Sequence, residues 1–307
     1  MDTATVVHRE TAPPAAPDPA RPVRRHRTWR RTLRLLLAGA LAAVLASMVV
    51  VVVHRWRALH AEPPVDPGRS AWALLDLATG ELRTSAEAAE TYTAESMIKV
   101  WIAADDLRRL AERRIRPHPD EIAALSAMIR DSDDHAAEVI YQRNGADAVV
   151  QRLISICGLT ETTVRPGWWS LTRMSARDAA RMGGCLADGR AAGPRWTKWV
   201  LEQMRRVRGE GYFGIVSALP AAQRDGLAIK NGWTLHVNEG RWAVNCLAVS
   251  DDWVLAVQTR YPAALGGLDH GGRTCAEVAS RVLAARASGR PGTEAGADAL
   301  GRIGGAR

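Results

Sequence analysis

The feature that most constrains this chain is a run of 19 residues without a charge, Leu35 to Val53. As a helix, at about 1.5 Å per residue, it would be about 28 Å long, enough to cross a hydrocarbon core of about 30 Å. Trp29 and Trp56 bracket the run, as expected of an interfacial aromatic belt. The run therefore predicts a membrane anchor at residues 35–53.

The arginines predict how this anchor is oriented. Seven of them lie between positions 21 and 34, whereas only Arg55 and Arg57 follow the run closely. The positive-inside rule then places the N-terminus in the cytoplasm and the large C-terminal part outside, as a single-pass protein of the cell membrane. A cleaved signal peptide is the alternative, with a poor small-residue site at 58–61, but the apolar run is long for one.

Composition divides the rest of the chain. Residues 1–34 are rich in Pro, Ala and Arg without an apolar period, which predicts a disordered basic tail in the cytoplasm. Residues 54–69 end in a stretch with three prolines and a glycine, typical of a linker. Residues 70–286 are long enough for one domain with a core, and residues 287–307 are expected to form a flexible tail.

The net charge of +8 belongs to the N-terminal part. Residues 1–60 hold ten arginines and three acids, so the chain's 41 basic and 33 acidic residues leave 31 and 30 for positions 61–307. The outer part is thus nearly neutral, and we expect no nucleic-acid partner.

All four cysteines lie in the predicted outer domain: Cys157, Cys185, Cys246 and Cys275. In an oxidising compartment an even number permits two disulfides, and four cysteines allow three pairings. Four buried thiols are an equally good interpretation. Neither a C-x-x-C pair nor a metal-ligand spacing accompanies them, so we expect no metal site.

Hydrophobic periodicity places strands at both ends of the domain and helices between them. Strand patterns cover 71–77, 81–85, 227–230, 242–249 and 253–259; helical patterns cover 95–113, 119–130, 134–143, 146–156, 175–187, 194–206 and 273–286. Strands so far apart in sequence are not joined by simple parallel crossovers. The pattern therefore predicts an α/β (α+β) fold with a largely antiparallel sheet flanked by helices.

Only three of the 41 basic residues are lysines, and two of these occur in short motifs. A base or proton shuttle must be able to lose its proton, which a desolvated ammonium can do and a guanidinium cannot. Lys99 closes the sequence SMIK that begins at Ser96, so that amine and hydroxyl lie one helical turn apart. Lys230 opens the sequence KNG that ends an apolar strand at Gly232.

Each of these segments also has a purely structural interpretation. Ser96 can be an ordinary capping serine at a helix start. In the sequence DSDD at 131–134, Ser132 can cap the next helix while the carboxylates complement its dipole. Asn231 and Gly232 form a favoured two-residue hairpin turn.

In this order, S-x-x-K, an S-D-[N]-like triplet and K-x-G resemble the penicillin-recognising serine enzymes, which include class A β-lactamases and D,D-peptidases. The resemblance spans roughly residues 70–286. It implies a two-lobed fold, an all-helical lobe against the antiparallel sheet. It also implies that Ser96 carries the acyl group, that Lys99 is its base, and that Ser132 relays a proton to the leaving nitrogen.

The same resemblance implies the substrate and its contacts. Lys230 would hold the carboxylate of a β-lactam or a peptidoglycan stem peptide, with Gly232 and Asp134 as further substrate-binding positions. The backbone N–H groups of Ser96 and Trp233 would form the oxyanion hole, and no cofactor is implied. Trp168, Trp169 and Trp233 are either walls of this cleft or core residues.

Two departures from the family pattern set expectations about turnover. Asp134 stands where the family usually has an amide, and its carboxylate should favour the charged form of Lys99. The stretch 160–174 contains Glu161 as its only acid, too early for the deacylating base of class A β-lactamases. We therefore expect acylation with slow release. A D,D-carboxypeptidase and an inactive relative that binds cell-wall peptide or a protein are the alternatives.

Overall fold

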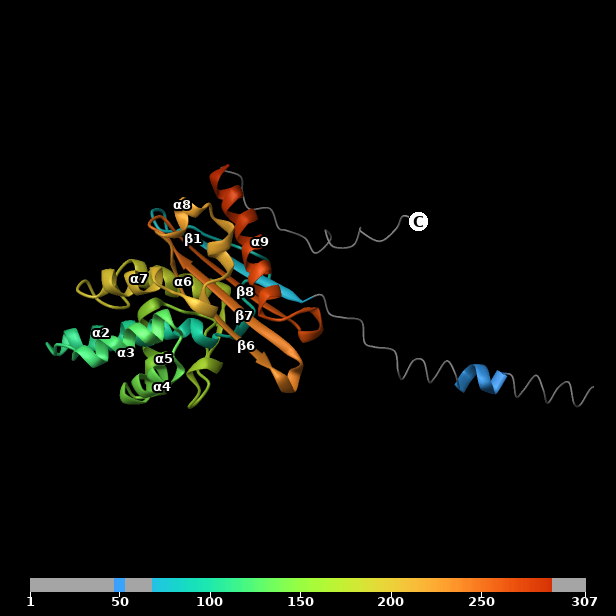
Figure 1. Ribbon diagram of the computed structural model, residues 1–307, viewed down its shortest axis with the longest axis horizontal. Coiled ribbons are helices and arrows are strands. Elements are labelled where there is room, and N and C mark those ends of the chain that lie inside the picture. Colours follow the sequence, from blue (N-terminus) through green and yellow to red (C-terminus); the bar gives the residue numbers. More distant parts are fainter. Residues whose placement is uncertain (1–46, 53–67, 289–307) are drawn as a thin grey trace, which may run out of the picture. The chain divides into compact units, whose positions relative to one another are not determined.

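The computed structural model describes residues 47–52 and 68–288 (Figure 1). The chain divides into two units, Met1–Pro64 and Val65–Arg307. In the first unit, residues 47–52 form an exposed piece of helix. The predicted tail 1–34, the rest of the predicted anchor 35–53 and most of both the linker and the C-terminal tail lie outside the described residues. Within the described residues, no helix has the length and apolar character needed to cross a bilayer.

The second unit is built on an antiparallel sheet with the order β2-β1-β8-β7, in which β5 and β6 both pair with β7. Its strands are β1 (Arg69–Asp76), β2 (Leu82–Thr84), β5 (Ala228–Ile229), β6 (Gly232–His236), β7 (Arg241–Val249) and β8 (Trp253–Pro262). A two-stranded sheet joins β3 (Thr91–Thr93) and β4 (Arg173–Ser175). The ends of the domain therefore meet in one sheet, as the sequence predicts.

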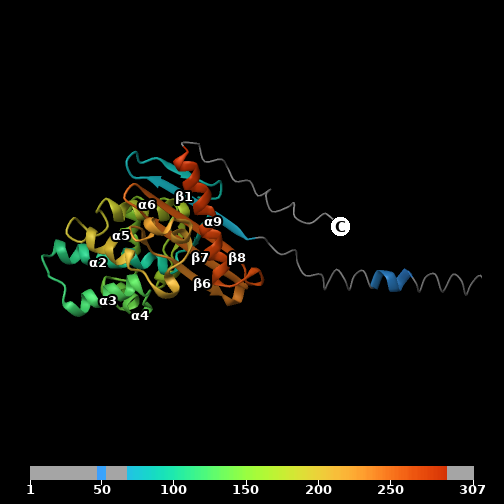
Figure 2. The ribbon, with the colours of Figure 1, turned by 45° about the horizontal axis from the view of Figure 1, so that its top comes forward.

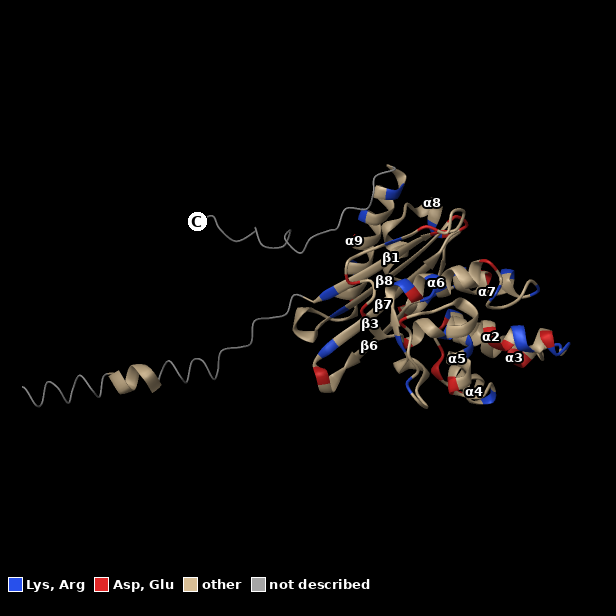
Figure 3. Ribbon diagram, turned by 180° about the vertical axis from the view of Figure 1, so that it is seen from behind, with Lys and Arg blue, Asp and Glu red and all other residues tan. Residues whose placement is uncertain are grey.

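The central strands β1, β7 and β8 are mostly apolar because both faces of the sheet are covered. In β1, Ala71 and Ala73 contact the core shared with the helical lobe, whereas Trp72 and Leu74 contact the opposite core. Successive side chains of a strand point to opposite faces, so this division follows from the pleat. In Figure 3 the charged residues lie mostly on helices and loops, and β1, β7 and β8 are mainly tan.

Helices cover the two faces unequally. They are α2 (Lys99–Glu112), α3 (Pro119–Arg130), α4 (Asp134–Arg143), α5 (Asp147–Cys157), α6 (Ala176–Ala187), α7 (Thr197–Arg205), α8 (Ala221–Arg224) and α9 (Leu268–Ala287). The long helix α9 lies along one face of the sheet, and α6 with the helical lobe lies on the other (Figures 1 and 2). At Gly183 of α6 a Cβ atom would lie 2.4 Å from Val254 Cγ1, so glycine permits this close packing.

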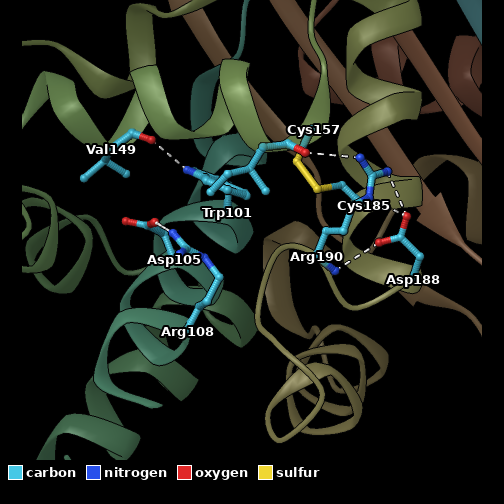
Figure 4. The surroundings of a disulfide bond; sticks show 9 residues. Trp101, Asp105, Arg108, Val149, Cys157, Cys185, Asp188 and Arg190 are labelled. Atoms are coloured by element: carbon cyan, nitrogen blue, oxygen red, sulfur yellow. Dashed lines mark hydrogen bonds and ion pairs between the residues drawn. A yellow bond between two sulfur atoms is a disulfide. The ribbon is translucent and has the colours of Figure 1, made fainter. Parts of the chain in front are cut away.

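Two disulfides connect elements of this core. Cys157 at the end of α5 is bonded to Cys185 in α6, and Cys246 in β7 is bonded to Cys275 in α9. Near the first of them, Arg190 pairs with Asp188 (Figure 4). Of the interpretations that the sequence leaves open, the structure therefore adopts two disulfides, in which the first cysteine pairs with the second and the third with the fourth.

Most predicted elements are confirmed, but four details differ. The predicted helix 95–113 begins as a 3-10 helix, η1 (Glu95–Ile98), before α2. The last helix starts at residue 268 rather than 273. Residues 231–232 form no hairpin turn: β5 and β6 are two pieces of one edge beside β7, and the chain reverses at residues 237–240. The sequence patterns also missed β3, β4 and β6, which are short or only partly buried.

Candidate active site

The predicted nucleophile lies on η1, between the sheet and the helical lobe. Ser96 is half-buried, whereas its neighbours Glu95 and Met97 are buried. The residues just before η1 are bound to the sheet by Asn245 of β7, whose side-chain amide donates to the carbonyls of Thr93 (2.8 Å) and Ala94 (3.2 Å). Ser96 is therefore presented by a turn fixed to a central strand, rather than by the first turn of an ordinary α-helix.

Lys99 begins α2 and is completely buried. Its ammonium donates to the backbone carbonyl and the hydroxyl (3.3 Å) of Ser132, and to Oδ1 of Asp134 (2.6 Å). An ammonium has three hydrogens, so these three acceptors match its full donor capacity. The structure thus brings the S-x-x-K and S-D-D segments together at this amine.

Ser132 lies in the turn between α3 and α4 with φ +60°. The sequence allows it to cap α4, but that interpretation is wrong: the cap is Asp133, whose carboxylate accepts from Ala136 N at 2.7 Å. This leaves the Ser132 hydroxyl facing the lysines, where it also accepts from Lys230 Nζ at 3.0 Å. Left-handed backbone at a non-glycine residue is sparsely populated, and such residues cluster at functional sites.

Lys230 and Gly232 lie where the sheet edge passes from β5 to β6. The Lys230 side chain is buried and also donates to the Asn231 carbonyl at 3.0 Å, while Asn231 Nδ2 donates to the carbonyls of Gly211 and Phe213. A Cβ atom on Gly232 would lie 2.4 Å from Met97 N and 2.7 Å from Ser96 N. Glycine is therefore required here because the strand backbone runs directly against the nucleophile turn.

Burial governs the charges of the two lysines. Desolvation lowers the pKa of Lys99 from its ordinary value, and the hydrogen bond and charge of Asp134 oppose this shift. Desolvation, assisted by the nearby charge of Lys99, holds the pKa of Lys230 well below its ordinary value. The sequence argument about Asp134 has the right sign, but burial outweighs it at Lys99, so both amines lose their protons more readily than exposed lysines.

The segment 160–174 places an aromatic ring at Lys99. Trp169 is buried, its ring centre lies 5.3 Å from Lys99 Nζ, and its indole N–H donates to Glu138 Oε2 at 2.9 Å. Glu161 instead binds Arg177, Arg181 and Ser175. The one acid of this segment is therefore engaged in ion pairs on the α6 side.

The other predicted wall residues lie in different surroundings. Trp233 is half-buried on β6, and its ring packs edge-on against Phe213 at 5.4 Å between centroids. Trp168 is 60% exposed and so is not a core residue.

Asp134, at the start of α4, is also solvent-facing, with 82% of its side chain exposed although it pairs with a buried amine.

Sequence reasoning missed two groups that hold the nucleophile turn. Asn245 is a single amide inside the apolar strand β7, and that isolation in an otherwise apolar run was its only signal. Glu95, which directly precedes Ser96, accepts from His236 Nε2 on β6 at 2.9 Å. No spacing in the sequence links Glu95 to His236, because the two residues are 141 positions apart.

Solved β-lactamases have the same fold. TLA-3 extended-spectrum β-lactamase aligns with a TM-score of 0.60 at 14% identity, over 71% of this chain and 92% of that one. A class A β-lactamase from Mycobacterium abscessus aligns with a TM-score of 0.56 at 18% identity, over 72% of this chain and 94% of that one. A β-lactamase from Burkholderia vietnamiensis aligns with a TM-score of 0.58 at 17% identity, over 72% of this chain and 91% of that one. At these identities the likeness establishes the fold alone.

Similar sequences occur in mycobacteria. The protein named "Putative lipoprotein LppW" in Mycobacterium tuberculosis and Mycobacterium bovis is 35% identical over 170 residues, which are 52% of this chain and 52% of each relative. The chain thus aligns over about half the length of the curated relatives it matches.

The sequence model of the Beta-lactamase enzyme family matches residues 122–283, just over half of the chain. The matched stretch contains Ser132 and Lys230, whereas Ser96 and Lys99 precede it. With the fold, the match identifies the chain as a member of the Beta-lactamase enzyme family.

Proposed function

We propose that the domain is a serine hydrolase of the β-lactamase and penicillin-binding type, in which Ser96 is acylated by a β-lactam or a peptidoglycan stem peptide. The observation that carries this proposal is the convergence of two buried lysines, Lys99 and Lys230, on the hydroxyl of Ser132. Burying two amines is costly, and a structural role would be met more cheaply by apolar side chains. Groups with perturbed pKa values gather where proton transfer is needed.

The acylation step that we propose uses these groups. Ser96 Oγ attacks the carbonyl carbon and gives its proton to the neutral amine of Lys99, whose lowered pKa makes that form accessible. The N–H groups of Ser96 and Trp233 stabilise the oxyanion. The carbon–nitrogen bond then breaks, and the leaving nitrogen takes a proton from Ser132, which is replenished from a lysine. Because the Ser132 oxygen accepts from both lysines, its own hydrogen remains for donation.

Release of the acyl group is expected to be slow. Water needs a base to attack the ester, and the acid of segment 160–174 is paired with Arg177 and Arg181. The buried ring of Trp169, and not the acid of this segment, lies at Lys99. A long-lived acyl-enzyme favours a peptidase-like or β-lactam-sensitive enzyme over an efficient β-lactamase.

We further propose that this domain works outside the cytoplasm, anchored through residues 35–53. Two disulfides support this location, because such bonds persist in oxidising compartments. The lipoprotein name of the mycobacterial relatives is consistent with a protein held at a membrane.

Labelling with a fluorescent penicillin tests the proposed nucleophile. The full chain should be labelled, Ser96→Ala should not be, and the exposed Ser217→Ala should be labelled like the parent. The specific rival is a binding protein without activity, favoured by the complete set of acceptors around Lys99. A folded parent that takes up no label would contradict the enzyme and support the rival.

A further inference from the structure

Glu95 and His236 form a buried contact that the acylation mechanism does not use. Glu95 is 3% exposed, and its Oε1 lies 2.9 Å from His236 Nε2. A carboxylate is a hydrogen-bond acceptor, so we assign the hydrogen of this contact to Nε2. Thr93 Oγ1 lies 3.3 Å from the same nitrogen. A carboxylate buried without a partner would be costly, so this contact holds the side chain firmly.

The backbone of Glu95 requires such a restraint. Its φ of +50° lies in the left-handed region, where the side chain of an L-residue crowds the backbone. In the described part of the chain only four non-glycine residues have positive φ, and two of them, Glu95 and Ser132, belong to this site. A conformation of this kind persists only where the surroundings impose it.

Strand β6 touches the nucleophile turn at both of its ends. At its start, the Gly232 backbone lies against the amides of Ser96 and Met97. At its end, His236 binds the carboxylate of Glu95. Trp233, whose N–H is the second proposed oxyanion donor, lies between these two attachments. A shift of β6 relative to the turn would therefore change the separation of the two oxyanion donors.

We propose that Glu95 and His236 are positioning residues: their buried contact fixes the turn that carries Ser96 against β6 and thereby sets the oxyanion hole. This inference rests on the proposed acylation of Ser96. It assigns the pair an effect on the rate of bond formation and little effect on substrate binding, because neither side chain needs to touch the substrate.

Acylation kinetics of the full chain test the role. With fluorescent penicillin at varied concentration, Glu95→Ala and His236→Ala should each lower the limiting acylation rate about tenfold or more, while the half-saturating concentration changes less than about threefold. Glu95→Gln should stay within about threefold of the parent rate, because the amide oxygen still accepts from Nε2. The double alanine variant should be no slower than either single one, since the two residues act as a unit.

The matched control is Glu239→Ala, which lies in the turn between β6 and β7 and removes an ion pair with Arg260 of β8. It should leave the limiting rate unchanged. Thermal unfolding of every variant checks that slower acylation does not reflect loss of the fold.

Amide hydrogen exchange of residues 93–98 supplies a readout that needs no substrate. Exchange should be about tenfold faster in Glu95→Ala and His236→Ala, and unchanged in Glu95→Gln and Glu239→Ala. If the parent takes up no label, the proposed acylation fails while exchange still decides whether the contact fixes the turn. An unchanged rate and unchanged exchange in Glu95→Ala, or a Gln variant as impaired as Ala, would overturn the proposal.

Discussion

At the scale of single residues, Asp134 is the most informative departure from the family pattern. Its carboxylate raises the pKa of Lys99 against the effect of burial. Replacing it by asparagine should lower that pKa further and increase the fraction of free amine. One pKa unit is a tenfold change in that fraction, so Asp134→Asn should speed acylation by about three- to tenfold at neutral pH.

Stopped-flow labelling of Asp134→Asn measures this effect. Asp131→Asn is the matched control, because Asp131 belongs to the same acidic segment but pairs with Arg208. Equal acylation rates in Asp134→Asn and the parent would show that Lys99 does not act as the base.

Lys230 makes a second prediction, about stability and pH. Its pKa in the folded protein lies well below the ordinary 10.5, so between these values the unfolded chain holds more protons than the folded one. The free energy of unfolding must then rise with pH in that window. Burial raises the pKa of Tyr92 to about 12, so this tyrosine stays protonated throughout the range below pH 9.5.

Urea unfolding of the parent and Lys230→Met between pH 7 and 9.5 checks this sign. The free energy of unfolding of the parent should rise more steeply with pH than that of the variant. The difference between variant and parent should therefore favour the variant more at pH 7 than at pH 9.5. Parallel curves would mean that Lys230 keeps its ordinary pKa in the fold.

At the scale of elements, the contact between β6 and η1 determines whether the site can form. A methyl group at Gly232 would lie 2.4 Å from Met97 N, so Gly232→Ala must push the strand away from the turn. We expect it to lower the acylation rate at least tenfold, a loss of about 1.4 kcal/mol in transition-state stabilisation. Gly226→Ala, where a Cβ atom meets nothing within 4 Å, should label like the parent. Normal labelling of Gly232→Ala would argue against this strand as a wall of the site.

The sequence predicts an element well where the residues that define it are close together in the chain, and poorly where its partners are distant in sequence. Helices such as α3 and α4 match their predicted ranges because capping residues and a local apolar period define them. The short strand β6 was missed because its pairing depends on β7 and its burial on η1. The three motifs could be recognised by type and order, and they do come together around Ser132. The Glu95–His236 contact could not, because it joins distant residues without a motif.

At the scale of the whole molecule, one disulfide connects two layers of the fold, whereas the other joins two helices on the same side of the sheet. The Cys246–Cys275 bond joins the sheet to α9 and closes a loop of 29 residues in the unfolded chain. Chain entropy predicts that such a bond contributes about 3–4 kcal/mol to the free energy of unfolding. Cys246→Ala/Cys275→Ala should lose about this amount in urea unfolding, and a loss below about 1 kcal/mol would contradict a stabilising role.

The central claim is that Ser96 forms a long-lived acyl-enzyme. Intact mass spectrometry of the full chain, followed over time after mixing with excess benzylpenicillin, tests it most directly. The predicted result is a mass increase equal to the whole penicillin, stable over hours and absent from Ser96→Ala. No added mass on a folded parent, or an adduct that disappears rapidly as hydrolysed penicillin accumulates, would contradict the account.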